Sequence, residues 1–424
     1  MGPDTTLVRR ALAATVAIAV TLIITYVLVI GFRPLPALEF TPAPGITQAP
    51  AVDSSAIDVA LESIEGAEGI RVVAAAPEDG PEASSPSSYE AVSSDEQYSL
   101  ASITKLISVL TALEQKPLAP GEAGDLFTIS ARDRQITQSV LARNGVAANA
   151  PIGQTFTEQE LLQIILLESA NDLAISYVTW VFGSEAEFLN AAREYLAAHG
   201  FEHTEIVEPT GLDAGNVSTP HEVLQLGQLA LENPTIAAIT RMSSVQIPGW
   251  GEVKSTNWFV QNEGALGLKT GTLLTDYFNI LVAEDDSRAG RTFTTFVVTL
   301  DKPSQEARIS ETAEIFDAVD KTLVEQTVLG ARALAGMLTT WQGDSIDLVS
   351  ANAEALTTVL LPGEEPQISV EVPAVRSGSA GDQVGTITVT DPTGPREVAV
   401  ELASAVEIPS FWWRLTHPRE VLGL

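Results

Sequence analysis

The chain has 424 residues, of which 45% are apolar, and this length predicts more than one domain. Its 23 basic and 55 acidic residues give a net charge of −32. Such a charge repels phosphate backbones, which excludes nucleic acid as a partner. The chain has no cysteine, which excludes disulfides, zinc–thiolate sites and cysteine nucleophiles.

The first feature along the chain is an uncharged apolar run, "ALAATVAIAVTLIITYVLVIGF", over residues 11–32. This run is long enough for a helix to cross a hydrocarbon core of about 30 Å. Arg9 and Arg10 precede it and only Arg33 follows closely, which predicts a cytoplasmic N-terminus over residues 1–10 and an extracytoplasmic bulk. A cleaved signal peptide is the alternative, but the run exceeds the usual apolar core of such peptides. The pattern therefore favours a retained transmembrane anchor.

A proline-rich stretch, residues 33–52, follows the apolar run and predicts a semi-extended linker. "IRVVAAA" (residues 70–76) is typical of a strand and precedes a polar loop that extends to about Gln97. From there to about residue 240, apolar residues recur at helical spacing, as in "TEQELLQIILLESANDLAISYVTWVF". This region is predicted to be helical.

After residue 244 the pattern changes to strands. "GALGLKTGT", "DYFNILVAE" and "RTFTTFVVTL" predict an antiparallel meander, and residues 304–326 predict a helix. Regular turn signals over residues 330–406 predict a small all-β domain, with a sandwich as the expected form. The pattern as a whole therefore predicts a domain of sheet and helices over residues 53–329 and a β-rich domain over 330–406.

The last segment, residues 407–424, is aromatic and amphipathic and contains "FWWRL". Its tryptophans and arginines predict contact of residues 411–424 with a membrane interface, in addition to the anchor at 11–32. The alternative is that the tryptophans pack against the protein's own β domain.

The stretch "YSLASITKLISVL" places Ser102 three residues before Lys105, where a helix is expected to begin. A lysine in the first turn faces the positive end of the helix dipole, so stability does not favour it there. Burial and the dipole both lower a lysine pKa, which would leave an amine able to take the serine proton. The alternative is that Lys105 merely reaches solvent, and in both interpretations Ser99 is expected to cap the helix.

A second motif, Lys269-Thr270-Gly271-Thr272, favours the catalytic interpretation. Chance supplies about 0.4 Ser-x-x-Lys pairs in such a chain but only about 0.04 Lys-Thr-Gly runs. A glycine within a strand usually marks the close approach of a ligand or of another backbone.

Ser-x-Asn, a third motif, occurs at residues 169–171, 255–257 and 350–352. The last follows Lys-Thr-Gly, and the second lies too close before Lys269 to form a separate wall of a cleft. Composition does not choose among the three. The choice of Ser169 and Asn171 follows from a resemblance to the serine penicillin-recognising enzymes, which place this motif before Lys-Thr-Gly and at a helix end.

Ser-x-x-Lys, Ser-x-Asn and Lys-Thr-Gly, in this order, make the chain resemble the serine penicillin-recognising enzymes. Within that superfamily it resembles the low-molecular-weight D-alanyl-D-alanine carboxypeptidases of peptidase family S11. "ASITKLISVLTALE", "ESANDLA", "EPTGLDAGNVST" and "GLKTGT" are similar to successive family motifs over roughly residues 70–330. The resemblance implies an α/β fold of the α+β type, a β-lactamase/transpeptidase-like domain whose antiparallel sheet is flanked by helices. The β-rich stretch and the aromatic tail resemble the family's C-terminal domain and its membrane-associating end.

The resemblance also implies roles for the motif residues. Ser102 attacks the carbonyl between the two terminal D-alanines of a peptidoglycan stem peptide, with Lys105 as base and Ser169 relaying the proton. Asn171 hydrogen-bonds the substrate amide and Lys105, and Lys269 and Thr270 bind the terminal carboxylate. The backbone N–H groups of Ser102 and Thr272 form the oxyanion hole, and Gly271 belongs to the same substrate-binding strand. The implied partners are the stem peptide and β-lactams that acylate Ser102, and no cofactor or metal is implied.

The chain departs from the family in two places. "TLLTDYFN" after Lys-Thr-Gly lacks the usual Ala-Gly pair, and the stretch before Ser102 is a long polar loop. Both departures bear on substrate fit.

Three other functions fit single features of the sequence. A class A β-lactamase would use a glutamate to activate water, but "EPTGLD" lacks the Glu-x-x-Leu-Asn pattern, so Glu208 is interpreted as an exposed loop residue. A zinc peptidase would use His199, Glu202 and His203, but Gly200 is expected to end the helix between the two histidines. A tethered wall-binding protein without catalysis is the third, although every motif residue is intact.

Overall fold

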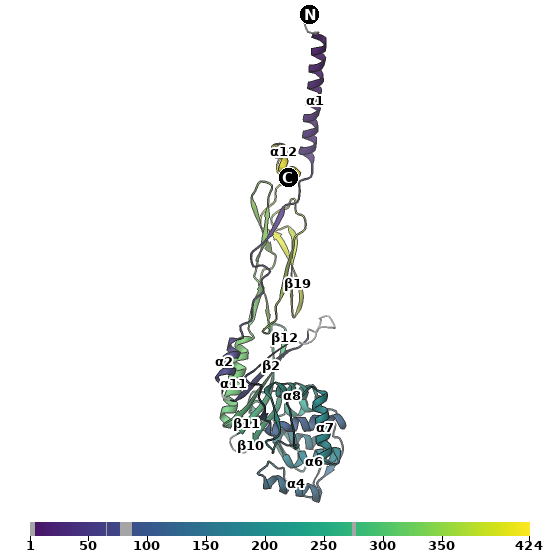
Figure 1. The fold of residues 1–424 in the computed structure, drawn as a ribbon, viewed down its shortest axis with the longest axis vertical. Helices are drawn as coiled ribbons and strands as arrows, with labels where there is room; N and C mark the ends of the chain where they lie inside the picture. The colour runs from purple at the N-terminus through teal and green to yellow at the C-terminus, as the bar shows by residue number, and fades with distance from the viewer. Residues whose placement is uncertain (1–4, 65, 77–86, 274–276) are drawn as a thin grey trace. The chain divides into compact units, whose positions relative to one another are not determined.

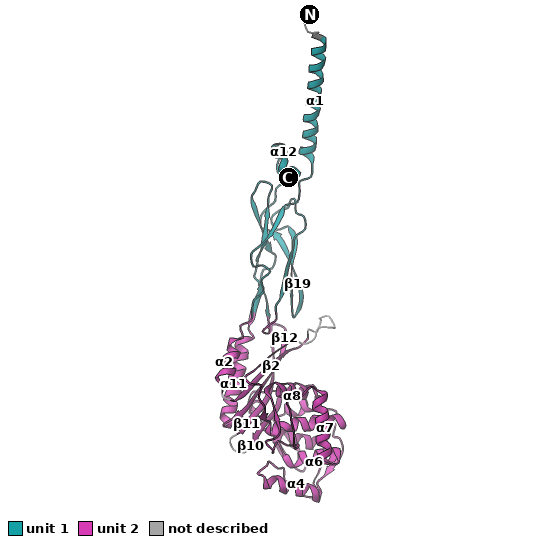
Figure 2. Cartoon of the chain, in the orientation of Figure 1, with its two compact units in different colours: residues 1–51, 326–358, 365–424 teal, residues 52–325, 359–364 magenta. Residues whose placement is uncertain are grey.

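The structure is a computed structural model that describes residues 5–64, 66–76, 87–273 and 277–424. It contains two compact units, which Figure 2 colours separately. The large unit comprises residues 52–325 and 359–364, and the small unit comprises residues 1–51, 326–358 and 365–424. The sequence placed the boundary between sheet-and-helix and β-rich domains at residues 329 and 330.

A five-stranded antiparallel sheet forms the centre of the large unit (Figure 1). Its strands, in spatial order, are β10 (Gly267–Leu273), β11 (Tyr277–Arg288), β12 (Arg291–Lys302), β2 (Ala67–Ala74) and β3 (Ser88–Val92). Side chains alternate between its two faces, as β11 illustrates: Ile280 and Val282 belong to one apolar cluster, and Leu281 and Ala283 to the other. The predicted meander over β10, β11 and β12 is confirmed.

Helices cover both faces of this sheet. On one face lie α2 (Ser55–Ser63), α10 (Trp258–Asn262) and α11 (Gln305–Thr322). The other face carries the larger helical layer, composed of α3 (Thr104–Gln115), α4 (Ala131–Ala142), α5 (Glu158–Gln163), η2 (Ile164–Glu168), α6 (Asn171–Phe182), α7 (Glu185–Ala198), α8 (Pro220–Glu232) and α9 (Pro234–Thr240). Figure 1 shows α2 and α11 on one side of the sheet and α8 on the other.

Short strands interrupt the region that the sequence predicted to be helical, and one further pair follows that region. They form three two-stranded sheets: β4 (Tyr98–Ser99) with β7 (Val217–Ser218), β5 (Leu126–Thr128) with β6 (Thr155–Thr157), and β8 (Ser244–Ile247) with β9 (Gly251–Lys254). The β4–β7 pair connects two segments more than a hundred residues apart. Sequence periodicity does not detect strands of two residues, because they depend on the partner strand.

The small unit contains a six-stranded antiparallel sheet. Its spatial order is β1 (Glu39–Pro42), β14 (Leu334–Thr339), β15 (Ser345–Ser350), β19 (Gly394–Leu402), β18 (Gln383–Asp391) and β17 (Gln367–Glu371). A separate pair joins β13 (Glu325–Leu329) and β16 (Leu356–Val359). The all-β prediction is confirmed, although its strands form one main sheet where a sandwich was expected.

One prediction for the small unit is wrong. Residues 33–52 were expected to be only a linker, but Glu39–Pro42 pair with Gly336–Thr339 of β14. Pro42 is compatible with this strand because β1 lies at the edge of the sheet, where a missing N–H breaks no ladder.

The apolar run near the N-terminus forms α1 (Thr5–Phe32). Within the part of the chain that the structure describes, it is the one helix long and apolar enough to cross a membrane, with a mean hydropathy of 2.6. Of the expected N-terminal segment 1–10, residues 1–4 lie outside the described residues.

The aromatic tail forms α12 (Phe411–Thr416) and α13 (Pro418–Leu422). It packs on the C-terminal end of α1: Tyr26 Oη donates a hydrogen bond to Leu415 O at 2.7 Å, and the rings of Phe32 and Phe411 lie 5.7 Å apart. Trp413 and Trp341 pack against a small apolar cluster of Ile30, Leu35 and Val421, whereas Trp412 is 75% exposed. The tail therefore contacts α1 as well as the β-rich unit.

Candidate active site

Ser102 and Lys105 lie at the junction of η1 (Ala101–Ile103) and α3, beneath the edge strand β10. Lys105 Nζ lies 2.8 Å from Ser102 Oγ and donates a second hydrogen bond of 2.8 Å to Thr210 O. Lys105 is fully buried, whereas Ser102 is partly accessible. The alternative in which Lys105 reaches solvent is therefore wrong.

The capping role expected for Ser99 is also wrong. The residues that flank η1 and α3 at their N-terminal ends are Leu100 and Ile103, and neither makes a side-chain cap. Ser99 instead belongs to strand β4, and its buried Oγ has no hydrogen-bond partner among the described residues. The strand shifts Ser99 away from the first turn of the helix.

The pKa of Lys105 is held well below its usual range. Burial is the largest cause, and the nearby ammonium of Lys269 adds to it, while Glu208 opposes both. A neutral amine in hydrogen-bond contact with a serine hydroxyl can accept its proton, so this geometry suits a nucleophile and its base.

A loop that contains Glu208 packs against the Ser102–Lys105 pair, since Lys105 Nζ donates a hydrogen bond to Thr210 O in this loop. The Glu208 carboxylate accepts hydrogen bonds from the main-chain N–H groups of Thr210 (3.0 Å), Gly211 and Leu212 (2.9 Å). It also accepts one from Asn216 Nδ2 at 3.1 Å. The interpretation of Glu208 as an exposed loop residue is therefore wrong. Its carboxylate shapes the loop, and these bonds leave it poorly placed to activate a water in the manner of a class A β-lactamase.

Ser169 and Asn171 lie in the turn between η2 and α6. Ser169 has a positive φ of 65°, which turns the chain sharply before α6 begins at Asn171. Asn171 N donates to Val146 O at 2.8 Å, which anchors the turn. Ser169 Oγ and Asn171 Oδ1 are buried and have no hydrogen-bond partner among the described residues. Buried polar atoms are usually paired, so these two are available to a ligand.

Lys269, Thr270 and Gly271 lie on β10, the edge strand of the five-stranded sheet, and Thr272 is exposed further along it. A Cβ on Gly271 would lie 2.9 Å from Leu100 O and 3.1 Å from Ala101 Cβ. The glycine thus allows β10 to approach the backbone just before Ser102, as its occurrence in a strand indicated. Of the departure "TLLTDYFN", residues 274–276 lie outside the described residues.

Arg308 on α11 was missed by the sequence analysis. It is buried, and its Nη1 donates to Gly271 O at 3.3 Å and to Asn279 O at 3.2 Å. Burial lowers the pKa of Arg308 to about 10. Burial, with the Arg308 charge second, lowers the pKa of Lys269 to about 7. Lys269 and Arg308 are thus two buried basic residues at β10, and their positive charge favours the binding of an anion there.

Thr256 was set aside with the second Ser-x-Asn segment, yet it contacts the site. Its Oγ1 lies 2.6 Å from Thr270 Oγ1, and its N–H donates to Leu167 O at 3.0 Å. Thr256 therefore links η2, which leads to Ser169, with the Lys-Thr-Gly strand. Spacing alone could not reveal a residue that acts by bridging two motifs.

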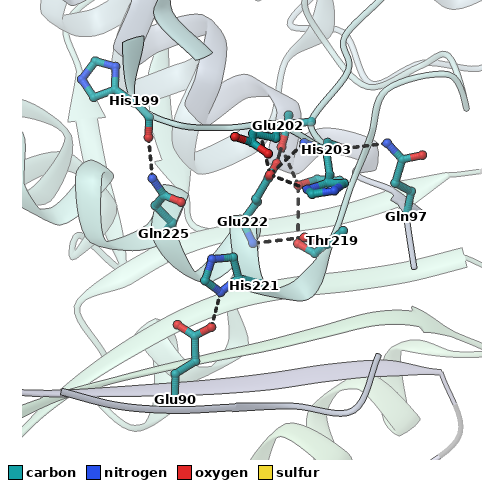
Figure 3. A network of polar contacts seen from close by, with 11 residues as sticks. Glu90, Gln97, His199, Glu202, His203, Thr219, His221, Glu222 and Gln225 are labelled. Atoms are coloured by element: carbon teal, nitrogen blue, oxygen red, sulfur yellow. Dashed lines mark hydrogen bonds and ion pairs between the residues drawn. The ribbon is translucent and has the colours of Figure 1, made fainter. Parts of the chain in front are cut away.

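The His199, Glu202 and His203 motif does not form a metal site (Figure 3). Helix α7 ends at Ala198, and Gly200 has a φ of 78°. His203 Nδ1 lies 3.1 Å from Glu222 Oε1, and His199 O accepts a hydrogen bond from Gln225 Nε2 at 2.6 Å. The two histidines therefore do not share one helix face, and each contacts a residue of α8 instead: His199 contacts Gln225, and His203 contacts Glu222.

The site thus places a serine–lysine pair between a helical layer and an antiparallel sheet. Residues 89–285 match the model of one family, described as Peptidase_S11, D-alanyl-D-alanine carboxypeptidase. This part of the chain is therefore similar to peptidase family S11. It contains Ser102, Lys105, Ser169, Asn171 and Lys269.

Two curated relatives and one solved structure illustrate what the chain is similar to. A D-alanyl-D-alanine endopeptidase of Pseudomonas aeruginosa is 26% identical over 32% of this chain and 41% of its own length. A D-alanyl-D-alanine carboxypeptidase of Mycobacterium tuberculosis is 29% identical over 40% of this chain and 57% of its own. The chain thus spans about half the length of these relatives. Penicillin binding protein 5 from Haemophilus influenzae shares the fold, with a TM-score of 0.51, 14% identity, and coverage of 80% of this chain and 97% of that one.

Proposed function

We propose that this protein is a serine-type D-alanyl-D-alanine carboxypeptidase that removes the terminal D-alanine from peptidoglycan stem pentapeptides. The observation that carries the proposal is the buried Lys105 Nζ, 2.8 Å from Ser102 Oγ and with a strongly lowered pKa. The two named relatives are a D-alanyl-D-alanine endopeptidase and a D-alanyl-D-alanine carboxypeptidase, which supports a D-alanyl peptide as the substrate class here. The activity would serve cell wall remodelling.

In the proposed reaction Ser102 Oγ attacks the carbonyl carbon between the two terminal D-alanines, and Lys105 accepts the hydroxyl proton. The backbone N–H groups of Ser102 and Thr272 stabilise the tetrahedral oxyanion. Ser169 relays a proton to the leaving amine, so that free D-alanine departs and an ester remains on Ser102. Water then hydrolyses the ester and regenerates the serine.

The substrate carboxylate binds at Lys269 and Thr270, and Asn171 holds the substrate amide. Three observations support these roles: the buried Arg308 adds a second cation beside the strand that carries Lys269, the Thr270 hydroxyl already contacts Thr256, and Asn171 Oδ1 has no partner among the described residues. A β-lactam carries a carboxylate beside a strained amide, so it acylates Ser102 as a substrate mimic.

The experiment that tests the proposal is incubation of the purified protein with a synthetic stem pentapeptide, followed by mass spectrometry of the products. We expect free D-alanine and the tetrapeptide, and neither product with Ser102→Ala. A folded Ser102→Ala variant that releases D-alanine at the original rate would overturn the proposal. Rapid turnover of a chromogenic cephalosporin, in place of stoichiometric acylation, would favour a β-lactamase.

We propose further that α1 anchors the protein in the cell membrane as a single span, with a cytoplasmic N-terminus and an extracytoplasmic catalytic domain. The arginine bias of the flanks supports this orientation. We propose that α12 and α13 lie at the membrane–water interface on the extracytoplasmic side of the cell membrane. Exposed Trp412 and Leu424, next to the end of α1, support that placement.

A further inference from the structure

Asn279 on β11 is fully buried, and both ends of its side chain bind main-chain groups from other segments. Its Nδ2 donates to Ser99 O at 2.7 Å, and its Oδ1 accepts from Asp301 N at 2.9 Å. The amide therefore ties the strand that precedes Ser102 to the end of β12.

Only two residues, Leu100 and Ala101, separate Ser99 from Ser102. Ala101 has a φ of 46°, a left-handed conformation that costs a residue with a side chain about 1–2 kcal/mol. Such a conformation persists only where the surrounding groups fix the chain. Here Asn279 holds Ser99 O, and Leu100 N donates to Asn216 O at 2.8 Å.

Asn279 also lies directly opposite Gly271 in the β10–β11 register. A Cβ on Gly271 would lie 3.2 Å from Asn279 Cβ and 2.9 Å from Leu100 O, so the three backbones are in close contact. Arg308 Nη1 donates to the carbonyl oxygens of both Asn279 and Gly271. The position of the Lys-Thr-Gly strand is thus coupled to that of the nucleophile segment through one residue.

Resting on the proposed function, we infer that Asn279 is a positioning residue for the acylation step. It fixes the backbone before Ser102 relative to β10, and so sets the distance between the serine hydroxyl and the carboxylate-binding residues Lys269 and Thr270. It touches neither substrate nor the reacting atoms. An amide that served only to pair two buried main-chain groups would affect stability and leave the chemical step unchanged.

The experiment compares Asn279→Ala and Asn279→Asp with the unaltered chain. A fluorescent penicillin is the probe, and stopped-flow measurement separates its binding constant from the acylation rate constant. Aspartate retains the acceptor for Asp301 N but loses the amide that donates to Ser99 O. Asn262→Ala is the matched control, because Asn262 is exposed on α10 and its Nδ2 also bonds a carbonyl, Trp258 O, at 2.8 Å. Thermal unfolding of each variant establishes the temperature at which all are folded.

We expect both Asn279 variants, at that temperature, to lose about 10- to 100-fold in the acylation rate constant, because small misplacements of reacting groups have effects of that size. The penicillin binding constant should change by less than about threefold, and Asn262→Ala should match the unaltered chain. Folded Asn279 variants with lower melting temperatures but an unchanged acylation rate would overturn the inference alone. An unaltered chain that no penicillin acylates would overturn the proposed function as well.

Discussion

Lys105 and Lys269 are both fully buried lysines of one site, but the proposed reaction needs them in opposite protonation states. Lys105 acts as a neutral base, whereas Lys269 binds a carboxylate as a cation. Their charges interact, since Lys269 is the second cause of the lowered Lys105 pKa. A protonated Lys269 therefore favours the neutral form of Lys105, and one charge serves both binding and base strength.

This pairing predicts a bell-shaped pH dependence of the second-order rate constant for acylation by a penicillin. The rate rises as Lys105 loses its proton, and it falls again as Lys269, with a pKa of about 7, loses its charge. Lys269→Arg should remove the alkaline decline, because arginine stays charged. The measurement is acylation by a fluorescent penicillin across the pH range. An alkaline decline that Lys269→Arg leaves in place would assign it to another group.

At the scale of elements, the loop from Glu208 to Leu212 packs against the segment that carries Ser102 and Lys105. Gly211 has a φ of 83°, and a Cβ there would lie 1.7 Å from Ala101 O. No side chain fits at that distance, so the loop approaches the nucleophile segment only because residue 211 is a glycine.

Gly211→Ala is therefore expected to lower the acylation rate at least about tenfold and the free energy of unfolding by more than about 1 kcal/mol. Gly153→Ala is the matched control: its φ is 89°, and no atom would lie within 4 Å of its Cβ. It incurs the same backbone penalty without the contact. Penicillin acylation and thermal unfolding of both variants check the prediction, and equal acylation by the two would refute it.

An element could be predicted from the sequence where a local pattern determines it, and could not be predicted where a distant segment of the chain determines it. Strands β11 and β12 were predictable because alternation along each strand matches the two apolar layers. The motif residues were predictable because their order is rare in a chain of this composition. Glu39–Pro42, by contrast, pairs with a strand some three hundred residues away, and its prolines indicate a linker. Arg308 and Thr256 carry no local signal, because only the tertiary fold brings them to β10.

At the scale of the whole molecule, the C-terminal tail meets the C-terminal end of α1 within the small unit. Arg414 Nη1 donates to Gly31 O and Arg33 O, each at 3.4 Å, so a cation lies at the C-terminal end of α1. That position is favourable for a positive charge because of the helix dipole. The tail therefore completes the end of the anchor helix while leaving Trp412 exposed.

Deleting residues 1–32 tests the proposed interfacial role of the tail. The deletion removes the partners of Phe411 and Leu415 and leaves these side chains free to enter a membrane interface. We expect the shortened protein to sediment with anionic and zwitterionic vesicles, and to lose this binding when Phe411, Trp412 and Trp413 are also changed to alanine. A shortened protein that stays wholly in the supernatant would contradict the interfacial placement.

The central claim is that Ser102 is the nucleophile and Lys105 its base. Its most direct test is peptide mapping by mass spectrometry after the full chain reacts with benzylpenicillin. The account predicts one penicilloyl group per chain, on the peptide that contains Ser102, and none with Ser102→Ala. Lys105→Met should fold but acylate far more slowly, because it keeps the buried volume and removes the amine. A penicilloyl group on another residue, or full acylation of the Lys105→Met variant at the original rate, would contradict the account.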